Sequence, residues 1–464
     1  MAAPVLPAAP PPAEPLRGLC DGAVHLPGEP AYEAGRVPWN LVVDQRPAAV
    51  AYPATPDDVV AVVRAAAAAG LRVAPQGTGH NAGPLGDLRD VVLLRTSQMT
   101  GVTVDASACR VRVRAGTLWL EAVEAAAAQG LAVLHGSSPD VGVVGYSLGG
   151  GMGWYARALG LQANAITGAE IVTGDGRVLE VDADRHADLF WALRGGGGNV
   201  GIITALEFRA FPFDTAFAGM LVWDWRHARD VLSRWATWAV SAPDAATTAL
   251  RLMQLPPIPE IPEPFRGRQL VIIDGAVLAD DDEAAAIIAP LRELQPEVDT
   301  FARAPVATLA RLHMDPEEPT PAVSQTATLA SLPDEAIAAL LEVAGPGSGS
   351  SLLMTELRQL GGALARPAAG AGALPQLDGE FVLFAAGMAL SPEMGAQGHA
   401  DAVRIASAMA PWDNGRRYLN FAEEPINVAA GYGPQQWARL QAIRSAADPA
   451  GTVLANHPVP RRIT

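Results

Sequence analysis

The chain has 464 residues but only two cysteines, Cys20 and Cys109. Two thiols cannot form a disulfide framework, and they are too few for the cysteine-rich sites that hold structural zinc. The zinc-binding pattern H-E-x-x-H is missing as well. The sequence therefore predicts neither a disulfide scaffold nor a metal site.

Positive charge is also scarce. Lysine and arginine together number 33 against 49 aspartates and glutamates, which gives a formal net charge of −16 at pH 7. A nucleic acid or an anionic membrane needs a basic patch on its protein partner. We therefore expect no nucleic-acid partner, no membrane partner and no steering of acidic substrates.

Long apolar runs are missing too. No uninterrupted run reaches the roughly 18 residues that would span a bilayer. The N-terminus, MAAPVLPAAPPPAEP, is apolar but is broken by prolines and has no basic residue, so it predicts a disordered leader rather than a signal peptide. These features predict a cytoplasmic protein and leave open whether it is a monomer or a homodimer.

Glycine, by contrast, is abundant, and its first cluster is RVAPQGTGHNAGPLGDL (72–88). Glycines allow several backbone N–H groups to converge on one anionic oxygen, which a pyrophosphate-binding loop requires. His80 is the only nucleophilic ring in this loop. The alternative is a tight surface turn that happens to contain a histidine.

Part of this loop, GTGHNA (77–82), also fits the dinucleotide fingerprint G-x-G-x-x-G/A. That fingerprint requires a helix to begin within the motif. Gly83, Pro84 and Gly86 follow at once and form helices poorly. The sequence therefore argues against a Rossmann site.

The second glycine cluster is HGSSPDVGVVGYSLGGGMGWYARALGL (135–161). Glycines beside valines fit a backbone that lies flat against a planar ligand, because side chains would hold the ligand away. GYSLG (145–149) also satisfies the nucleophile elbow G-x-S-x-G of serine hydrolases, but glycines rather than a helix follow Ser147. A packing serine is favoured, and a Ser147 hydrolase is the alternative.

The third cluster is DLFWALRGGGGNVGIITALEF (188–208), a short helix, four glycines and a β-rich run. A flexible hinge would explain the glycines alone. In this order, however, the three segments resemble the flavin segments of the vanillyl-alcohol-oxidase superfamily, with its PCMH-type FAD-binding fold, and in particular its berberine-bridge-enzyme-like branch.

The resemblance implies that His80 is bonded to the 8α-methyl group of FAD. Some members have a cysteine just before the proline of the second segment that makes a second bond; this chain has Ser138 there, so we expect attachment through His80 alone. The cofactor-binding residues that the resemblance implies are Gly77, Thr78, Gly79, His80, Asn81, Ser138, Val141, Gly142, Gly145, Ser147, Gly149, Gly150, Gly198, Asn199, Gly201, Ile203 and Asn420.

A further segment, RRYLNF (416–421), predicts a strand on which Arg416, Tyr418 and Asn420 share one face. An ordinary edge strand is the alternative. The segment resembles the Tyr-x-Asn element of berberine-bridge-like enzymes, in which the tyrosine is the base beside the flavin. The resemblance makes Tyr418 the candidate base and Tyr146 a second active-site ring.

The reaction that the resemblance implies is hydride transfer from an alcohol or amine carbon to flavin N5 while Tyr418 takes the heteroatom proton. The expected substrate is a small molecule of the sugar, polyketide or alkaloid type, and the expected acceptor is O2, which gives H2O2. A phenol with a pKa of about 10 is a poor base at pH 7, so Tyr418 needs a depressed pKa or a hydrogen-bonded network, with Arg416 as one candidate cation. A dehydrogenase, an oxidative cyclase and a catalytically silent flavin protein remain alternatives.

The expected fold class is α+β, with two domains. We expect a leader over 1–38, an FAD-binding domain over 39–212, an antiparallel-sheet cap that binds substrate over 213–409, and a segment over 410–464 that returns to the FAD domain, where Asn456 and His457 are candidate contacts. Expected cap elements are strands over 220–223, 270–276 and 381–390 and helices over 228–240, 281–294 and 334–343. The proline-rich stretch 255–265 predicts a surface loop. His313 is expected to be a solvated loop histidine, with a place in the wall of the cavity as the alternative.

Overall fold

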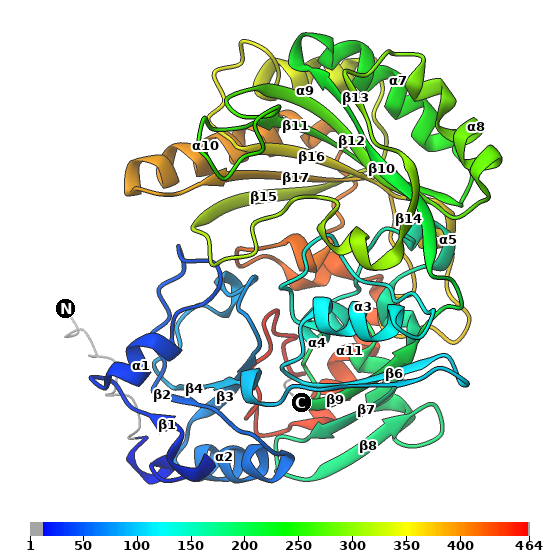
Figure 1. Cartoon of the computed structure of the whole chain (residues 1–464). Coiled ribbons are helices and arrows are strands. Elements are labelled where there is room, and N and C mark those ends of the chain that lie inside the picture. Colours follow the sequence, from blue (N-terminus) through cyan, green and yellow to red (C-terminus); the bar gives the residue numbers. More distant parts are fainter. Residues whose placement is uncertain (1–12, 463–464) are drawn as a thin grey trace.

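Three β-sheets organise the chain, whose computed structural model describes residues 13–462 (Figure 1). The first sheet has the strand order β1-β2-β4-β3 and the second has the order β5-β6-β9-β7-β8. The third and largest has the order β13-β10-β12-β11-β16-β17-β15, with β14 paired to β10. Figure 1 shows this large sheet above the two smaller ones.

The first sheet delivers the chain to the His80 loop. Helix α2 (Pro56–Ala68) begins with the capping box of Thr55 and Asp58 that its sequence predicts, and it precedes β3 (Arg72–Gln76). The other members of this sheet and its helix are β1 (Val24–His25), β2 (Ala49–Ala51), β4 (Val91–Arg95) and α1 (Pro30–Gly35). Strand β1 lies within the expected leader and pairs with β2, so this part of the leader belongs to the sheet. Residues 1–12 of the expected leader lie outside the described residues.

The second sheet is antiparallel throughout. Its strands are β5 (Val102–Asp105), β6 (Arg110–Arg114), β7 (Ile166–Val172), β8 (Val178–Asp182) and β9 (Ile202–Arg209). The helices in this part of the chain are α3 (Trp119–Ala127), α4 (Val143–Leu148), α5 (Ala156–Leu159) and α6 (Ala187–Leu193).

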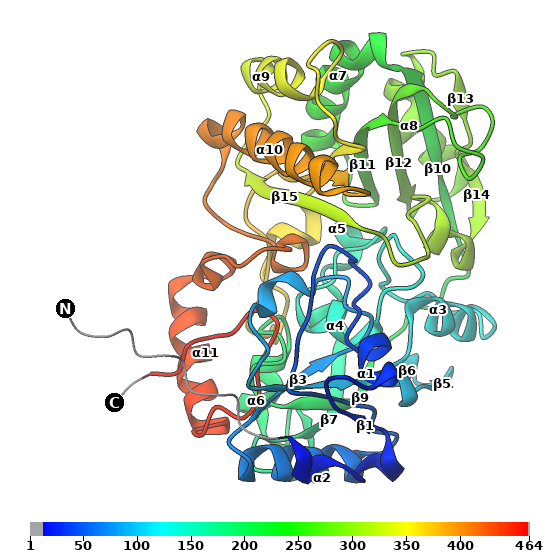
Figure 2. The same cartoon turned by 90° about the vertical axis from the view of Figure 1, so that its left-hand side faces the viewer.

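The large sheet is also antiparallel at every pairing. Its strands are β10 (Thr215–Asp224), β11 (Ala246–Gln254), β12 (Gln269–Val277), β13 (Val298–Asp299), β14 (Ala302–Pro305), β15 (Ala322–Leu329), β16 (Met354–Gln359) and β17 (Phe381–Met388). Helices α7 (Ala228–Ser241), α8 (Asp281–Arg292), α9 (Asp334–Ala344) and α10 (Pro392–Ala408) cover one face of it (Figure 2). This arrangement confirms the α+β class and the antiparallel sheet expected from the sequence.

The two faces of the large sheet differ in character. Leu250, Leu252 and Ile273 pack with the helices in one apolar cluster. Arg251 and Asp274, which are neighbours of these residues along the strands, are buried and charged. Since neighbouring side chains on a strand point to opposite faces, the charged residues face away from the helices, toward the two smaller sheets.

The C-terminal part of the chain returns to the smaller sheets. Helix α11 (Pro434–Ala447) packs against α6, and Val453 then pairs with Val73 of β3 (Figure 2). Arg444 and Asp448 form a buried ion pair that closes this turn. Within residues 13–462, no helix combines the length and the apolar character that crossing a membrane would take.

Candidate active site

His80 is held on three sides. The Trp39 ring stacks on the His80 ring, with the ring centres 4.0 Å apart and the planes at 17°. The hydroxyl oxygen of Thr78 lies 2.8 Å from Nδ1 of His80. Nε2 of His80 lies 3.4 Å from Oδ1 of Asp140, a residue of the second glycine segment. The first two glycine segments therefore meet at His80.

Asp140 is the charged member of this group. Its Oδ2 accepts a hydrogen bond of 2.5 Å from Nε1 of Trp39, and its Oδ1 accepts one of 3.2 Å from the hydroxyl of Ser138. Burial works to raise the pKa of Asp140, but His80, Trp39 and Ser138 together hold that pKa below its usual value. Asp140 is therefore a carboxylate at neutral pH.

Glycines in all three segments border open space. A methyl carbon built at Gly142 or Gly145 would meet no heavy atom within 4 Å, and at Gly77 and Gly198 the nearest atom would be 3.8 Å and 3.9 Å away. Several buried polar atoms in the same segments and the C-terminal tail have no hydrogen-bond partner among the described residues; they include Asn81 Oδ1, Asn456 Oδ1 and His80 Nε2, which has only its ion-pair contact with Asp140. Exposed backbone and unpaired polar atoms fit the binding of a polar cofactor such as FAD.

The sequence suggested that the backbone of the second segment lies flat against a planar ligand. In the structure this is not so throughout the segment. Gly142 caps helix α4, and Ser147 lies in the last turn of that helix. A nucleophile elbow places its serine between a strand and a following helix. Ser147 is instead fully buried, and its hydroxyl has no hydrogen-bond partner within residues 13–462. The structure thus provides no base for a Ser147 hydrolase.

Tyr418 and Asn420 meet directly beyond α4. Asn420 Nδ2 donates to the Tyr418 hydroxyl at 3.2 Å and to the Tyr146 carbonyl at 3.0 Å, while the Met152 N–H donates to the Tyr418 hydroxyl at 2.9 Å. A methyl carbon at Gly149 would collide with Asn420, and one at Gly150 would lie 3.1 Å from the Tyr418 ring. The absence of side chains at these two glycines therefore lets the Tyr-x-Asn element approach the second segment.

The strand expected over 416–421 is wrong. Tyr418 has an extended backbone, and a single 3-10 turn, Leu419–Phe421, follows it. Arg416 does not share a face with Tyr418, because its guanidinium donates to the Tyr432 carbonyl and lies 3.5 Å from Asp378. Without a neighbouring ladder, side-chain hydrogen bonds rather than strand alternation bring Tyr418 and Asn420 together.

Tyr418 is deeply buried, whereas Tyr146 is partly buried. Burial raises the pKa of Tyr418 to about 12, although Asn420, Met152 and Arg358 act to lower it. The pKa of Tyr418 is thus not depressed. A phenol base needs either a depressed pKa or a hydrogen-bonded network, and the structure provides the network. The Tyr146 ring packs under Gly136 and Gly151, and its hydroxyl has no hydrogen-bond partner in the part of the chain that the structure describes.

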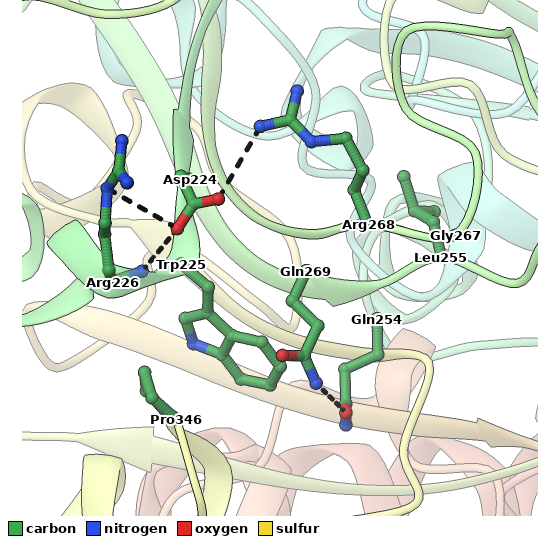
Figure 3. A pocket seen from close by; sticks show the side chains of 9 residues that line it. All are labelled: Asp224, Trp225, Arg226, Gln254, Leu255, Gly267, Arg268, Gln269 and Pro346. Carbon is green, nitrogen blue, oxygen red and sulfur yellow. Dashed lines mark hydrogen bonds and ion pairs between the residues drawn. The ribbon is translucent and has the colours of Figure 1, made fainter.

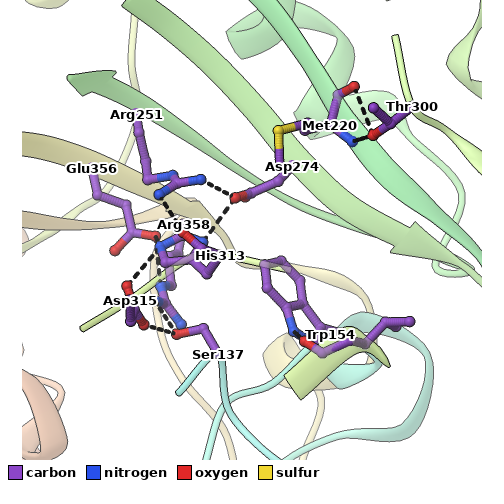
Figure 4. A network of polar contacts seen from close by, with 11 residues as sticks. Ser137, Trp154, Met220, Arg251, Asp274, Thr300, His313, Asp315, Glu356 and Arg358 are labelled. Atoms are coloured by element: carbon purple, nitrogen blue, oxygen red, sulfur yellow. Dashed lines mark hydrogen bonds and ion pairs between the residues drawn. The ribbon is translucent and has the colours of Figure 1, made fainter. Parts of the chain in front are cut away.

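The cation nearest this network is Arg358, on β16 (Figure 4). Its Cζ lies 4.9 Å from the centre of the Phe421 ring, and that ring stands edge-on to Tyr418 with the centres 5.1 Å apart. Arg358 also donates to Glu356 at 2.9 Å and to the hydroxyl of Ser137 at 3.1 Å. Ser137 belongs to the second glycine segment, so Arg358 joins the large sheet to that segment.

His313 belongs to the same buried network, which corrects the expectation of a solvated loop histidine. Its side chain is 1% exposed, with Nδ1 2.8 Å from Asp274 and Nε2 3.1 Å from Glu356. Burial and Arg251 oppose its protonation, but Asp274, Asp315 and Glu356 outweigh them and raise the pKa of His313 to about 9. Arg251 forms an ion pair with Asp274. Three cationic side chains thus face three carboxylates.

No spacing motif connects the members of this network, so the sequence did not predict it. Arg251, Asp274 and Glu356 come from three different strands, and His313 comes from a loop. A charged residue in the middle of an otherwise apolar strand was the available signal. Such a residue is rarely buried unless it is paired.

Most residues of the third segment contact other parts of the protein. Asn199 Nδ2 donates to the carbonyl of His457 at 3.1 Å, and Asn199 Oδ1 accepts from the Val459 N–H at 2.8 Å. Gly201 packs against the backbone of β7, and Ile203 is buried in β9. In the tail, His457 Nε2 lies 3.0 Å from the Leu419 carbonyl. Of the residues expected here, Gly198 is the one that borders open space.

A separate pocket of about 560 Å³ lies at one end of β10, β11 and β12 (Figure 3). Asp224 in its wall is paired with Arg226 and Arg268. The proline-rich loop begins here, since Leu255 lines the pocket. None of the site residues expected from the sequence lines this pocket.

One part of the chain matches a known domain family. Residues 47–182 match the FAD binding domain family. The described fold matches solved structures that have the PCMH-type FAD-binding fold expected from the sequence.

Individual relatives can be named. The chain is 36% identical to glucooligosaccharide oxidase of Sarocladium strictum over 37% of this chain and 35% of that protein, and 32% identical to (R)-6-hydroxynicotine oxidase of Paenarthrobacter nicotinovorans over 44% of each. The matches thus span less than half the length of these curated relatives. Among solved structures, BBE-like 1 of Physcomitrella patens has a TM-score of 0.83 at 19% identity, with 95% of this chain and 97% of that chain covered. At that identity the likeness shows the fold.

Proposed function

We propose that the chain is an FAD-dependent oxidase that carries its flavin on His80 and oxidises an alcohol or amine carbon of a sugar-, polyketide- or alkaloid-type molecule. One observation carries the proposal: the three glycine segments and the Tyr418–Asn420 pair meet. Asp140 lies beside His80, the Gly197 N–H of the third segment donates to the Leu148 carbonyl of the second at 3.0 Å, and Gly149 and Gly150 lie against Asn420 and Tyr418. The names of the relatives, which are FAD-linked oxidases acting on oligosaccharides and hydroxynicotine, support it.

The proposed division of labour follows the sheets. Residues 39–212 and 410–464 bind FAD, and residues 213–409 supply the wall of the substrate site. Gly77, Gly142, Gly145 and Gly198 leave backbone free for the cofactor, which accepts hydride from the substrate once it is bound. The small-molecule substrate and O2 are the partners we propose, for a monomer or a homodimer.

Tyr418 receives the proton from the substrate heteroatom in this proposal. The N–H groups of Met152 and Asn420 both donate to its oxygen, so they stabilise the phenolate more than the phenol. With a pKa near 12, Tyr418 is mostly a phenol at neutral pH, and it accepts the substrate proton only after it has lost its own proton to water. Loss of the substrate proton therefore depends on the donors and on Arg358, which offset the cost of a buried phenolate.

The test is oxygen consumption by purified protein against a panel of oligosaccharides, phenolic alcohols and cyclic amines. We expect one class to bleach the flavin without oxygen and to give H2O2 stoichiometrically with oxygen. Turnover with dyes but not with oxygen would indicate a dehydrogenase, and a ring-closed product would indicate oxidative cyclisation. A flavin that no compound in the panel bleaches would contradict the proposal.

The Tyr418→Phe variant tests the assignment of the base. We expect kcat to fall about 100-fold or more with flavin content unchanged, because general-base catalysis is typically of this size. Tyr155→Phe is the matched control, since Tyr155 is a buried tyrosine whose hydroxyl has no partner among the described residues. Equal activity of the two variants would remove Tyr418 from the mechanism.

A further inference from the structure

We propose that Asp140 and Trp39 position His80 for bond formation with the flavin, with Asp140 as the acceptor of the imidazole proton. This inference rests on the proposed function, because it requires FAD to be bonded to His80. Trp39 lies outside the three glycine segments, and Asp140 lies in the second of them at a position to which the sequence assigned no role. The inference comes from the contacts that surround the His80 ring.

The imidazole ring of His80 has a fixed orientation. Trp39 covers one face of His80 at 4.0 Å, and Thr78 lies at Nδ1. Asp140 lies 3.4 Å from Nε2 and is the only carboxylate within ion-pair distance of His80 among residues 13–462. The side chain of His80 is 22% exposed, so the ring is held without being sealed off.

Asp140 is itself fixed in place. The Trp39 indole N–H bonds its Oδ2, and the Ser138 hydroxyl bonds its Oδ1. The same tryptophan therefore stacks on the imidazole and orients the carboxylate beside it. Such an arrangement determines the ring orientation and the tautomer of a histidine, as the aspartate of a catalytic triad does.

The orientation and the tautomer of His80 decide which ring nitrogen can bond to the flavin. A carboxylate beside Nε2 favours the tautomer with its proton on Nε2, which leaves the lone pair on Nδ1 to react, with the Thr78 hydroxyl donating to it beforehand. The new bond joins Nδ1 to the 8α carbon, and one C–H bond of that methyl group breaks. The Nε2 proton passes to Asp140 and then to water. The proton of the broken C–H bond passes to water, and the two electrons of that bond reduce the flavin ring. Dioxygen then accepts these two electrons together with two protons and becomes H2O2.

The negative charge of Asp140 contributes to the same step. Positive charge develops on the imidazole as Nδ1 forms its bond, and an adjacent carboxylate stabilises it. Ser138 stands where some relatives would have a second attachment residue, and here its hydroxyl serves Asp140 instead. The pKa of Asp140 is held below its usual value, so this side chain is a carboxylate when bond formation begins.

The experiment measures the rate of covalent attachment separately from flavin binding. Full-length protein from riboflavin-starved cells is mixed with FAD, and the ratio of acid-stable flavin to total bound flavin is followed with time. We expect Asp140→Asn to bind FAD but to attach it about tenfold more slowly or worse, the usual scale for loss of a partner that orients a histidine. Asp87→Asn, an exposed carboxylate in the same loop that is paired with Arg89, should match the wild type.

A second variant keeps the inference falsifiable if Asp140→Asn folds poorly. Trp39→Phe retains a ring over His80 but removes the N–H that orients Asp140, so we expect attachment that is slower than in the wild type. Attachment at the wild-type rate in either variant, with normal total flavin, would overturn the inference while the proposed function stands. If the wild type itself attaches no flavin, the covalent part of the proposed function fails and this inference fails with it.

Discussion

At the scale of single residues, the structure places a different arginine near Tyr418 from the one that the sequence suggested. The sequence made Arg416 the candidate cation beside Tyr418, because strand alternation would have put both on one face. The structure directs Arg416 to the Tyr432 carbonyl and brings Arg358 to the Phe421 ring instead. These two residues are 58 positions apart from one another along the chain, so no local pattern could have identified Arg358.

The role of Arg358 leads to a prediction about pH dependence. Its positive charge acts to lower the pKa of Tyr418, so Arg358→Met should raise that pKa further. We expect the limb of the kcat/KM profile that reports deprotonation of Tyr418 to move to higher pH, with activity at pH 7 reduced about tenfold. The pH profile of purified variants measures this.

Two further variants control this prediction. Arg358→Lys retains the charge and should restore part of the profile. Arg416→Met removes an arginine from the same region without changing the surroundings of Tyr418, so its profile should overlay that of the wild type. A shift in the Arg416 variant, with none in the Arg358 variant, would reverse the assignment.

At the scale of elements, the structure confirms the predicted capping box and the cap strands expected over 220–223, 270–276 and 381–390, but it also contains strands that were not predicted. The Thr55–Asp58 capping box gave helix α2 because the signal is local and self-contained. Strands β11 and β16 were not predicted, because charged residues such as Arg251 and Glu356 interrupt their apolar pattern. Those residues are tolerated inside the sheet because they pair with charges from other strands, a fact that no single segment reveals.

The buried network predicts how the large sheet responds to pH. The pKa of His313 is raised to about 9 from an ordinary value near 6.5, so its pairing stabilises the fold fully below about pH 6.5. That contribution is lost as pH rises toward 9. The pKa of Glu356 is lowered to about 2 from about 4.5, because Arg358 and His313 outweigh the effect of burial, so its contribution is full above about pH 4.5.

We therefore expect the melting temperature to be highest between about pH 4.5 and 6.5 as far as this network is concerned, and to fall from pH 6.5 to 9. Differential scanning fluorimetry across this range measures it. His313→Gln should flatten the alkaline part of the curve, whereas His399→Gln, an exposed histidine paired with Glu424, should leave it unchanged. An unchanged alkaline slope in His313→Gln would show that other groups produce it.

At the scale of the whole molecule, contacts between distant segments build the site. The sequence predicted the order of the three glycine segments and the Tyr-x-Asn element, and it predicted the α+β class. It did not predict that these segments meet in space, because Asp140 lies 60 positions from His80 and Arg358 lies 221 positions from Ser137. Contacts of this kind depend on packing of the complete chain.

One such contact predicts a large effect on stability. Arg157 in α5 is 3% exposed and donates to the carbonyls of Ala242, Ala246 and Leu360, which belong to the large-sheet region. Removing it leaves buried carbonyl groups without donors, so Arg157→Ala should cost about 3 kcal/mol or more of unfolding free energy. Arg185→Ala, an exposed arginine paired with Asp182, is the control and should cost about 1 kcal/mol or less. Chemical denaturation measures both, and equal midpoints would contradict the prediction.

The central claim is that FAD is bonded to His80, and mass spectrometry of the proteolysed protein tests it most directly. The account predicts that the peptide containing His80 carries the mass of FAD in the wild type, with fragment ions that place the addition on the histidine. It also predicts that His80→Ala yields the unmodified peptide together with flavin that acid releases. An unmodified His80 peptide from yellow wild-type protein would contradict the claim.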